Sequence, residues 1–188
     1  MVSKMRNRKR EVLELVVAMR LGQVWCSRIG AVTAMDFDPL FVKDANDRMW
    51  PQWKFECRVH DMLSRPVVAE FDAAFSPDAP EHIKSEDEDV FIRNTTHSLS
   101  DPGVLMVGSP SFQSQPYASA ASKEGHINFK DGEELRTLML RYFGNVFLFS
   151  LNDEVVHTGF LSMAHYLLAL CCGKRAAAGM TINRGLAR

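Results

Sequence analysis

The chain contains 188 residues, of which 46% are hydrophobic, and its formal net charge is -1 at pH 7. This size and composition suit one globular domain with a substantial core. The balanced charge excludes a general basic surface, and no apolar run approaches the roughly 20 residues that cross a bilayer, so we expect neither a nucleic acid nor a membrane as a partner. The four cysteines lack the spacing of metal or redox sites, and the basic start lacks the apolar segment of a secretory signal, which predicts a cytoplasmic protein.

Both ends of the sequence differ from its middle. Residues 1–10 (MVSKMRNRKR) are a basic leader that we expect to be disordered. Residues 176–188 are small, basic and aperiodic, which predicts a flexible tail. Residues 11–175 contain neither an internal repeat nor a long linker, so we expect them to form a single domain.

Short β-rich runs alternate with helical patterns along the chain. We expect strands at residues 11–15, 31–37, 53–59, 71–76 and 103–108, the last entered through an Asp101-Pro102-Gly103 turn. Amphipathic spacing predicts helices at 85–99 and 131–143, and two late strands follow at 145–150 and 165–172. This alternation predicts an α/β sandwich around a mostly parallel sheet.

Polar residues gather where the predicted parallel strands end, which is where open parallel sheets bind ligands. Asp36 lies 22 residues after Glu14, a spacing that suits an acid binding ribose hydroxyls. The alternative is that Asp36 and Asp38 only cap the following helix. For Asp61 the alternative is a turn residue, and for His82 a surface histidine.

An ordered series of segments resembles the class I S-adenosylmethionine-dependent methyltransferases. It runs VLEL, AVTAMDFDP, VHD, FDAAFSPDAPEHI, GVLMVGSP and GHINFKDGEELRTLMLRYF, from about Val12 to Arg175, and FDAAFSPDAPEHI is its most specific part. The resemblance implies a Rossmann-like three-layer sandwich with a seven-stranded, mostly parallel sheet and an antiparallel last strand. It also implies that S-adenosylmethionine is the cofactor and lies across the carboxyl ends of the first four strands.

The resemblance assigns a role to individual residues. The implied cofactor-binding residues are Glu14 at the methionine amino group, Asp36 at the ribose, Phe37, Asp61 and Met62 at the adenine, and Ser76 and Asp78 beneath the sulfonium. His82 and His126 would face the acceptor. Methyl transfer needs a base only if the acceptor loses a proton, and His82, His126 and His157 are all candidates because histidine titrates near neutrality.

The sequence departs from the family pattern after the first strand. Family members have glycine there because the backbone turns sharply and the cofactor approaches closely. This chain has Val16-Val17-Ala18-Met19-Arg20, and its first glycine is Gly22. Two interpretations stay open: the loop has degenerated, or residues 16–29 result from a local frameshift. Only the leader precedes the first strand, so we expect no helical lid there.

Two prolines, Pro77 and Pro80, interrupt the fourth-strand block, and a proline inside a helix costs about 3 kcal/mol. Two polar segments fall outside the blocks. Residues 152–165 are open to three interpretations: a metal site, a polar loop beside the acceptor, or a surface loop with a satisfied His165. Residues 114–119 form either a segment that closes over an acceptor, with Tyr117 as a wall, or a mobile loop.

The sequence therefore predicts a methyltransferase with no metal, acting on a small-molecule or glycan-like acceptor. The alternative is a catalytically impaired protein of the same fold that serves as a binding or scaffold module. A dinucleotide-dependent enzyme is disfavoured because nothing in the sequence could cradle a pyrophosphate. The acceptor and the oligomeric state stay open.

Overall fold

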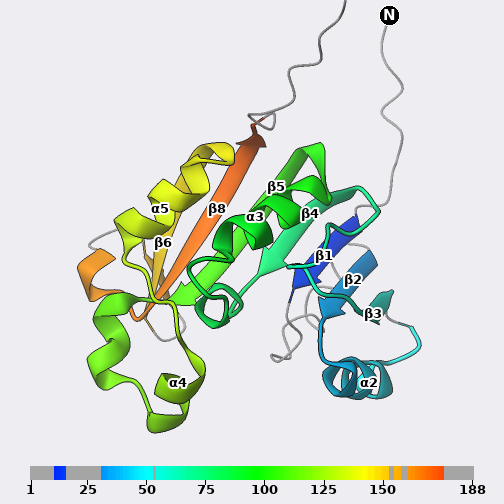
Figure 1. Cartoon of the computed structure of the whole chain (residues 1–188), viewed down its shortest axis with the longest axis horizontal. Helices are drawn as coiled ribbons and strands as arrows, with labels where there is room; N and C mark the ends of the chain where they lie inside the picture. The colour runs from blue at the N-terminus through cyan, green and yellow to red at the C-terminus, as the bar shows by residue number, and fades with distance from the viewer. Residues whose placement is uncertain (1–10, 16–30, 53, 153–154, 158–160, 176–188) are drawn as a thin grey trace, which may run out of the picture.

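The computed structural model describes residues 11–15, 31–52, 54–152, 155–157 and 161–175 (Figure 1). The strands are β1 (Glu11–Leu15), β2 (Ala31–Asp36), β3 (Phe55–Val59), β4 (Phe71–Ser76), β5 (Leu99–Pro110), β6 (Phe143–Asn152), β7 (Val155–His157) and β8 (Tyr166–Lys174). The helices are α2 (Pro39–Arg48), α3 (Glu88–His97), α4 (Ala120–Gly125) and α5 (Gly132–Leu140), with 3-10 turns η1 (Pro80–His82), η2 (Phe112–Tyr117) and η3 (Leu161–Met163). The predicted leader, tail and first loop lie outside the described residues.

The strands form one sheet, in the order β3-β2-β1-β4-β5-β8-β6-β7. Strands β1 to β5 are parallel to one another, and β8 runs antiparallel between β5 and β6. The predicted Rossmann-like α/β class and the antiparallel last strand are therefore confirmed. In the described part of the chain the sheet has eight strands, because the short β7 pairs with the end of β6 where the sequence suggested only a connection.

One predicted turn is wrong. The Asp101-Pro102-Gly103 segment lies inside β5, which begins already at Leu99. Pairing with β4 shifts at this point, since Phe71 faces Leu99 but Ala73 faces Val104. The extra residues of β5 leave the ladder, so proline and its missing N–H are accommodated without losing a ladder hydrogen bond.

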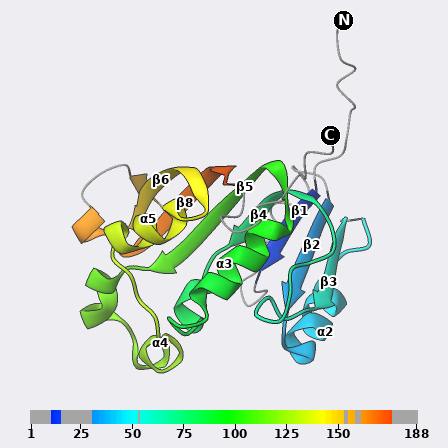
Figure 2. The same ribbon diagram turned by 45° about the horizontal axis from the view of Figure 1, so that its top comes forward.

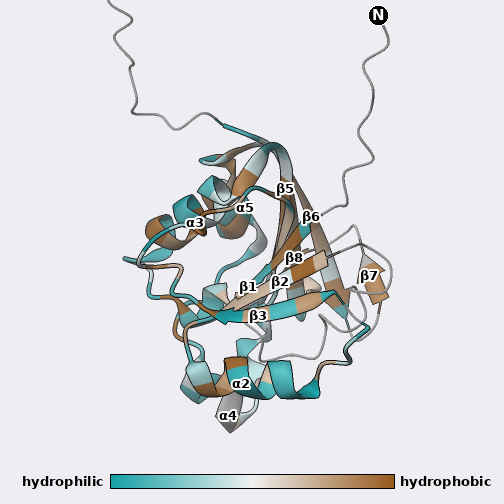
Figure 3. Cartoon of the chain, turned by 90° about the vertical axis from the view of Figure 1, so that its right-hand side faces the viewer, coloured by the Kyte–Doolittle hydropathy of each residue, from teal (hydrophilic) through white to brown (hydrophobic). Residues whose placement is uncertain are grey.

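Helices cover both faces of the sheet. In Figures 1 and 2, α3 and α5 lie side by side over one face, where Phe91 and Met139 pack with Leu13 in the main core. On the opposite face, α2 packs Val42 and Ala45 against Ala34 and Cys57 of β2 and β3 (Figure 3). Strand side chains alternate between these two cores, as the three-layer architecture requires.

The predicted helices form, with shorter bounds. Residues 85–99 contain α3, and residues 131–143 contain α5, which begins at a capping box in which Asp131 and Glu134 each accept the other's backbone N–H. None of the helices among the described residues is both long enough and apolar enough to span a membrane.

Candidate active site

Two buried acids lie near the ends of the neighbouring strands β1 and β2. Glu14 is 3% exposed and Asp36 is 6% exposed. Glu14 pairs in register with Ala34, two residues before Asp36, so both acids project from the same face of the sheet. Burial, followed by the nearby charges of Asp36 and Glu14, raises the pKa of the Cys57 thiol to about 12. The sheet thus presents two buried acids on one face at its carboxyl edge.

Asp36 and Asp38 have different roles in the turn after β2. Asp38 is the N-cap of α2, where its carboxylate accepts the N–H of Leu40 at 2.8 Å. Asp36 Oδ1 accepts the N–H of Asp38 at 2.8 Å, and its carbonyl accepts the N–H of His60. Phe37, between them, is 73% exposed. The helix cap is therefore Asp38, and Asp36 stands beside an exposed aromatic ring.

Asp61 and Met62 follow β3 but occupy different environments. Asp61 is exposed, and its Oδ1 accepts the N–H of Leu63 at 2.8 Å, which is the geometry of a turn. Met62 is buried in the main core, and its carbonyl accepts a hydrogen bond from Asn94 of α3. Contact of either residue with an adenine stays a prediction.

The chain turns sharply after β4. The Ser76 side chain is fully buried, and its Oγ has no hydrogen-bond partner among the described residues. Asp78 has a φ of 51°, and its N–H donates to the carbonyl of Gly108 and to the hydroxyl of Tyr166. Pro80 begins η1, where a missing N–H is tolerated. Neither proline of this block breaks a long helix.

Glu81, in the same turn, is a buried acid that sequence reasoning missed. Its side chain is fully buried, and neither carboxylate oxygen has a hydrogen-bond partner in the part of the chain that the structure describes. Burial, aided by the charge of Asp78, raises the pKa of Glu81 to about 8. The signal available in the sequence was an acid inside an otherwise apolar, proline-rich turn (APEHI).

The structure brings His82 and His126 together. Their ring centroids are 4.9 Å apart, in an edge-to-face arrangement. His82 Nδ1 lies 2.8 Å from the carbonyl oxygen of Gly125, and the carbonyl of Glu81 accepts the N–H groups of Ile127 and Asn128. Main-chain hydrogen bonds therefore hold the segment after α4 against η1.

His126 is suited to accept a proton. Desolvation by burial, followed by the neighbouring His82, lowers its pKa, and its Nδ1 is buried without a hydrogen-bond partner within the described ranges. A neutral imidazole with an available lone pair can act as a base or as a metal ligand.

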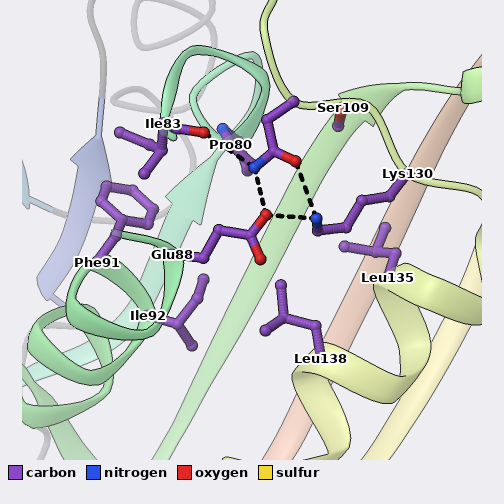
Figure 4. A pocket seen from close by; sticks show the side chains of 10 residues that line it. Pro80, Ile83, Glu88, Phe91, Ile92, Ser109, Lys130, Leu135 and Leu138 are labelled. Carbon is purple, nitrogen blue, oxygen red and sulfur yellow. Dashed lines mark hydrogen bonds and ion pairs between the residues drawn. The ribbon is translucent and has the colours of Figure 1, made fainter. Parts of the chain in front are cut away.

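A polar network of Glu88, Asn128 and Lys130 connects α3 to η1 and to the segment after α4. Figure 4 shows Glu88 of α3 and Lys130 pointing toward one another, and they form an ion pair. Asn128 donates to the Glu88 carboxylate and to the carbonyl of Ile83, and it accepts a hydrogen bond from Lys130 at 3.0 Å. These residues border a cavity of about 10 Å³, which has room for one water at most. The cavity is therefore a packing gap between η1, α3 and α5 and is too small for a ligand.

A larger hollow of about 210 Å³ borders His126. Its lining residues are Pro110, Ser114, Gln115, Tyr117, Ala118, His126 and His165. Tyr117, which is 87% exposed, forms part of the wall. Residues 114–119 and His165 thus lie beside a pocket. This favours the interpretations in which residues 114–119 close over an acceptor and residues 152–165 form a polar loop beside it.

The remaining candidate base, His157, lies elsewhere in the sheet. Its backbone belongs to β7, which pairs with β6 at the edge of the sheet, and β5, β8 and β6 separate it from β4. The sheet therefore does not place His157 with His82 and His126.

Comparison with known proteins identifies the fold. Neither a protein-family model nor a curated protein sequence matches the chain. Among solved structures, it is similar to the N-methyltransferase NodS from Bradyrhizobium japonicum WM9 in complex with S-adenosyl-L-homocysteine (15% identity, 87% of this chain and 78% of that chain, TM-score 0.65). It is also similar to the DhpI-SAM-HEP complex (16%, 88% and 80%, 0.65) and to a TehB-like SAM-dependent methyltransferase from Corynebacterium glutamicum (16%, 90% and 83%, 0.62). The chain has the fold of the class I S-adenosylmethionine-dependent methyltransferases.

Proposed function

We propose that the chain binds S-adenosylmethionine and transfers a methyl group to a small-molecule or glycan-like acceptor. The observation that carries the proposal is the pair of buried carboxylates, Glu14 and Asp36, next to the exposed ring of Phe37. Two of the similar structures contain the cofactor or its product, NodS with S-adenosyl-L-homocysteine and the DhpI-SAM-HEP complex. At 15% and 16% identity, the likeness to these structures supports the fold alone, so the proposal that the chain binds this ligand is based on Glu14, Asp36 and Phe37.

The residues at the carboxyl edge fit this cofactor chemically. Asp36 would accept the ribose hydroxyls, because a carboxylate offers about four acceptor positions and the Asp38 amide takes one. Glu14 would balance the charge of the methionine ammonium, and Phe37 would offer its face to the adenine. When bound, the cofactor supplies a methyl group already activated by a sulfonium, so the protein's task is mainly to orient and to exclude water.

The acceptor would occupy the hollow lined by His126, His165 and Tyr117. Its volume, about 210 Å³, suits a small molecule or a single sugar-like unit and not a folded macromolecule. If the acceptor heteroatom must lose a proton when it is methylated, an imidazole facing the hollow would accept that proton. The lowered pKa of His126 keeps that ring ready to take up the proton.

A titration with S-adenosylhomocysteine tests the cofactor. Wild-type chain is expected to bind with micromolar affinity in a calorimeter, and Asp36→Asn is expected to weaken binding about 10- to 100-fold, the loss of one charged hydrogen-bond acceptor. Asp38→Asn is the matched control, because asparagine caps a helix as well as aspartate does. Folded wild-type protein that releases no heat would contradict the proposal, as would equal weakening by both variants.

A second function is favoured by one observation in the sequence. Val16 and Val17 stand where cofactor-binding members of the family have glycine, and β-branched residues are poor at positive φ. A chain with such a loop could keep the fold as a binding or scaffold module. The same titration separates the two functions, because a scaffold needs no S-adenosylhomocysteine.

A further inference from the structure

We propose that Glu81, His82 and His126 form a binding site for a divalent transition-metal cation beside the hollow. Each residue offers one ligand atom, and these atoms all lie within 4.8 Å of one another. The three residues come from η1 and from the segment after α4, which main-chain hydrogen bonds hold together. This site does not depend on the proposed methyl transfer, because it follows from the side chains alone.

The burial of Glu81 is the first argument for a cation. A fully buried acid normally has hydrogen-bond partners, because a desolvated carboxylate without them is costly. Neither oxygen of Glu81 has a partner by hydrogen-bond geometry in the described part of the chain, and the neighbouring side chain of Asp78 is a second acid, whose proximity raises the pKa of Glu81 further. A divalent cation would supply the missing partner and would neutralise both acids.

The histidines supply the second argument. His82 Nδ1 contacts the carbonyl of Gly125 at 2.8 Å, so the proton sits on Nδ1 and the lone pair on Nε2. Metal-binding histidines usually make this bond from their second nitrogen, because it fixes the tautomer and the ring orientation. His126 adds a buried nitrogen with no hydrogen-bond partner among the residues described.

The donor set indicates the kind of metal. Two imidazoles and one carboxylate suit Zn²⁺, Fe²⁺, Co²⁺ or Mn²⁺, whereas Ca²⁺ and Mg²⁺ prefer oxygen ligands throughout. Ligands bound to one ion at about 2.1 Å lie roughly 3 to 3.5 Å apart, so donors up to 4.8 Å apart must close by roughly 1.5 Å when the ion binds.

The position of the site suggests what the cation does there. Sites with three protein ligands keep a position open for a water or a substrate, and His126 borders the hollow. An acceptor heteroatom in that hollow could therefore bind the cation, which would make its proton easier to lose. With the cation bound, His126 would act as a ligand, in place of its role as proton acceptor in the metal-free chain.

The test measures metal binding directly. Wild-type chain, stripped with a chelator and returned to chelator-free buffer, is titrated with Co²⁺ and with Zn²⁺, and followed by visible absorption and by calorimetry. We expect one equivalent of either ion, with d–d absorption bands for Co²⁺. Glu81→Gln and His126→Asn should each weaken binding at least 10-fold. His97→Asn, at an exposed position on α3, is the control and should bind as the wild type does.

Three outcomes would contradict the proposed metal site. The first is that the folded wild-type chain fails to bind metal at millimolar concentration, and the second is that His126→Asn binds with the same affinity as the wild type. The third is that the His97→Asn control loses binding as well. If Glu81→Gln does not fold, as judged by circular dichroism, His126→Asn and His82→Asn still decide the matter. No cofactor is present in these titrations, so a failure of cofactor binding would leave their result unaffected.

Discussion

Replacing Glu81 by glutamine should change how the stability of the metal-free protein depends on pH. Glu81 is fully buried, and its pKa rises from 4.5 to about 8 on folding. An acid whose pKa is raised in the folded state contributes stability that is fully present below pH 4.5 and is lost as the pH rises toward 8. Glutamine does not ionise, so Glu81→Gln should not show this loss.

The magnitude follows from the shift. Each unit of pKa difference corresponds to about 1.4 kcal/mol, so the shift from 4.5 to about 8 makes the ionised folded chain less stable by about 4 to 5 kcal/mol. At pH 7 about 3 kcal/mol of this is already lost, because most unfolded chains carry the ionised acid while most folded chains do not. Relative to the wild type, the variant should therefore gain stability steadily between pH 5 and 8.

Urea unfolding of both proteins, in a buffer that contains a chelator, measures this difference. The free energy of unfolding of Glu81→Gln minus that of the wild type should rise with pH and level off above about pH 8. A difference that stays constant from pH 5 to 8.5 would refute the reasoning, because it would mean that Glu81 ionises in the folded chain as easily as in water.

Two more predictions concern packing and hydrogen bonding. In Gly108→Ala the added methyl would lie 2.5 Å from the hydroxyl oxygen of Tyr166, so we expect a loss of about 1 to 3 kcal/mol and a lower denaturant midpoint with an unchanged slope; an unchanged midpoint would contradict it. Tyr142→Phe removes a 2.5 Å hydrogen bond that holds the pKa of Asp89 below its ordinary value. It should cost about 1 kcal/mol at pH 7, and the cost should shrink as the pH falls below 3.8, whereas a cost independent of pH would exclude this bond as its cause.

The fold could be predicted where local signals and burial agree. The acidic start of α5 and the apolar runs of β1 and β4 each placed an element close to its observed bounds. The Asp101-Pro102-Gly103 segment could not be assigned, because a turn sequence and a bulge in a strand look alike until the partner strand is known. β7 is three residues long, too short for a periodic signal.

Only the part of the candidate site that lies at the ends of the parallel strands could be predicted from the sequence. Glu14 and Asp36 follow from the rule that parallel sheets bind ligands at their carboxyl edge. The burial of Glu81 could not be predicted, because acidic side chains are mostly exposed. The sequence also does not show that the segment containing His126 packs over Glu81. Contacts between residues more than 40 positions apart belong to tertiary structure, and a single sequence carries no record of them.

The main-chain hydrogen bonds between η1 and residues 127–128 also affect how the sequence of the protein can change in evolution. The carbonyl of Glu81 and the amides of Ile127 and Asn128 are present whatever side chains these positions carry. Ile127 is 58% exposed, so selection can vary it with little effect on the core. The residues around the hollow can therefore change in evolution while the backbone keeps His126 in its place.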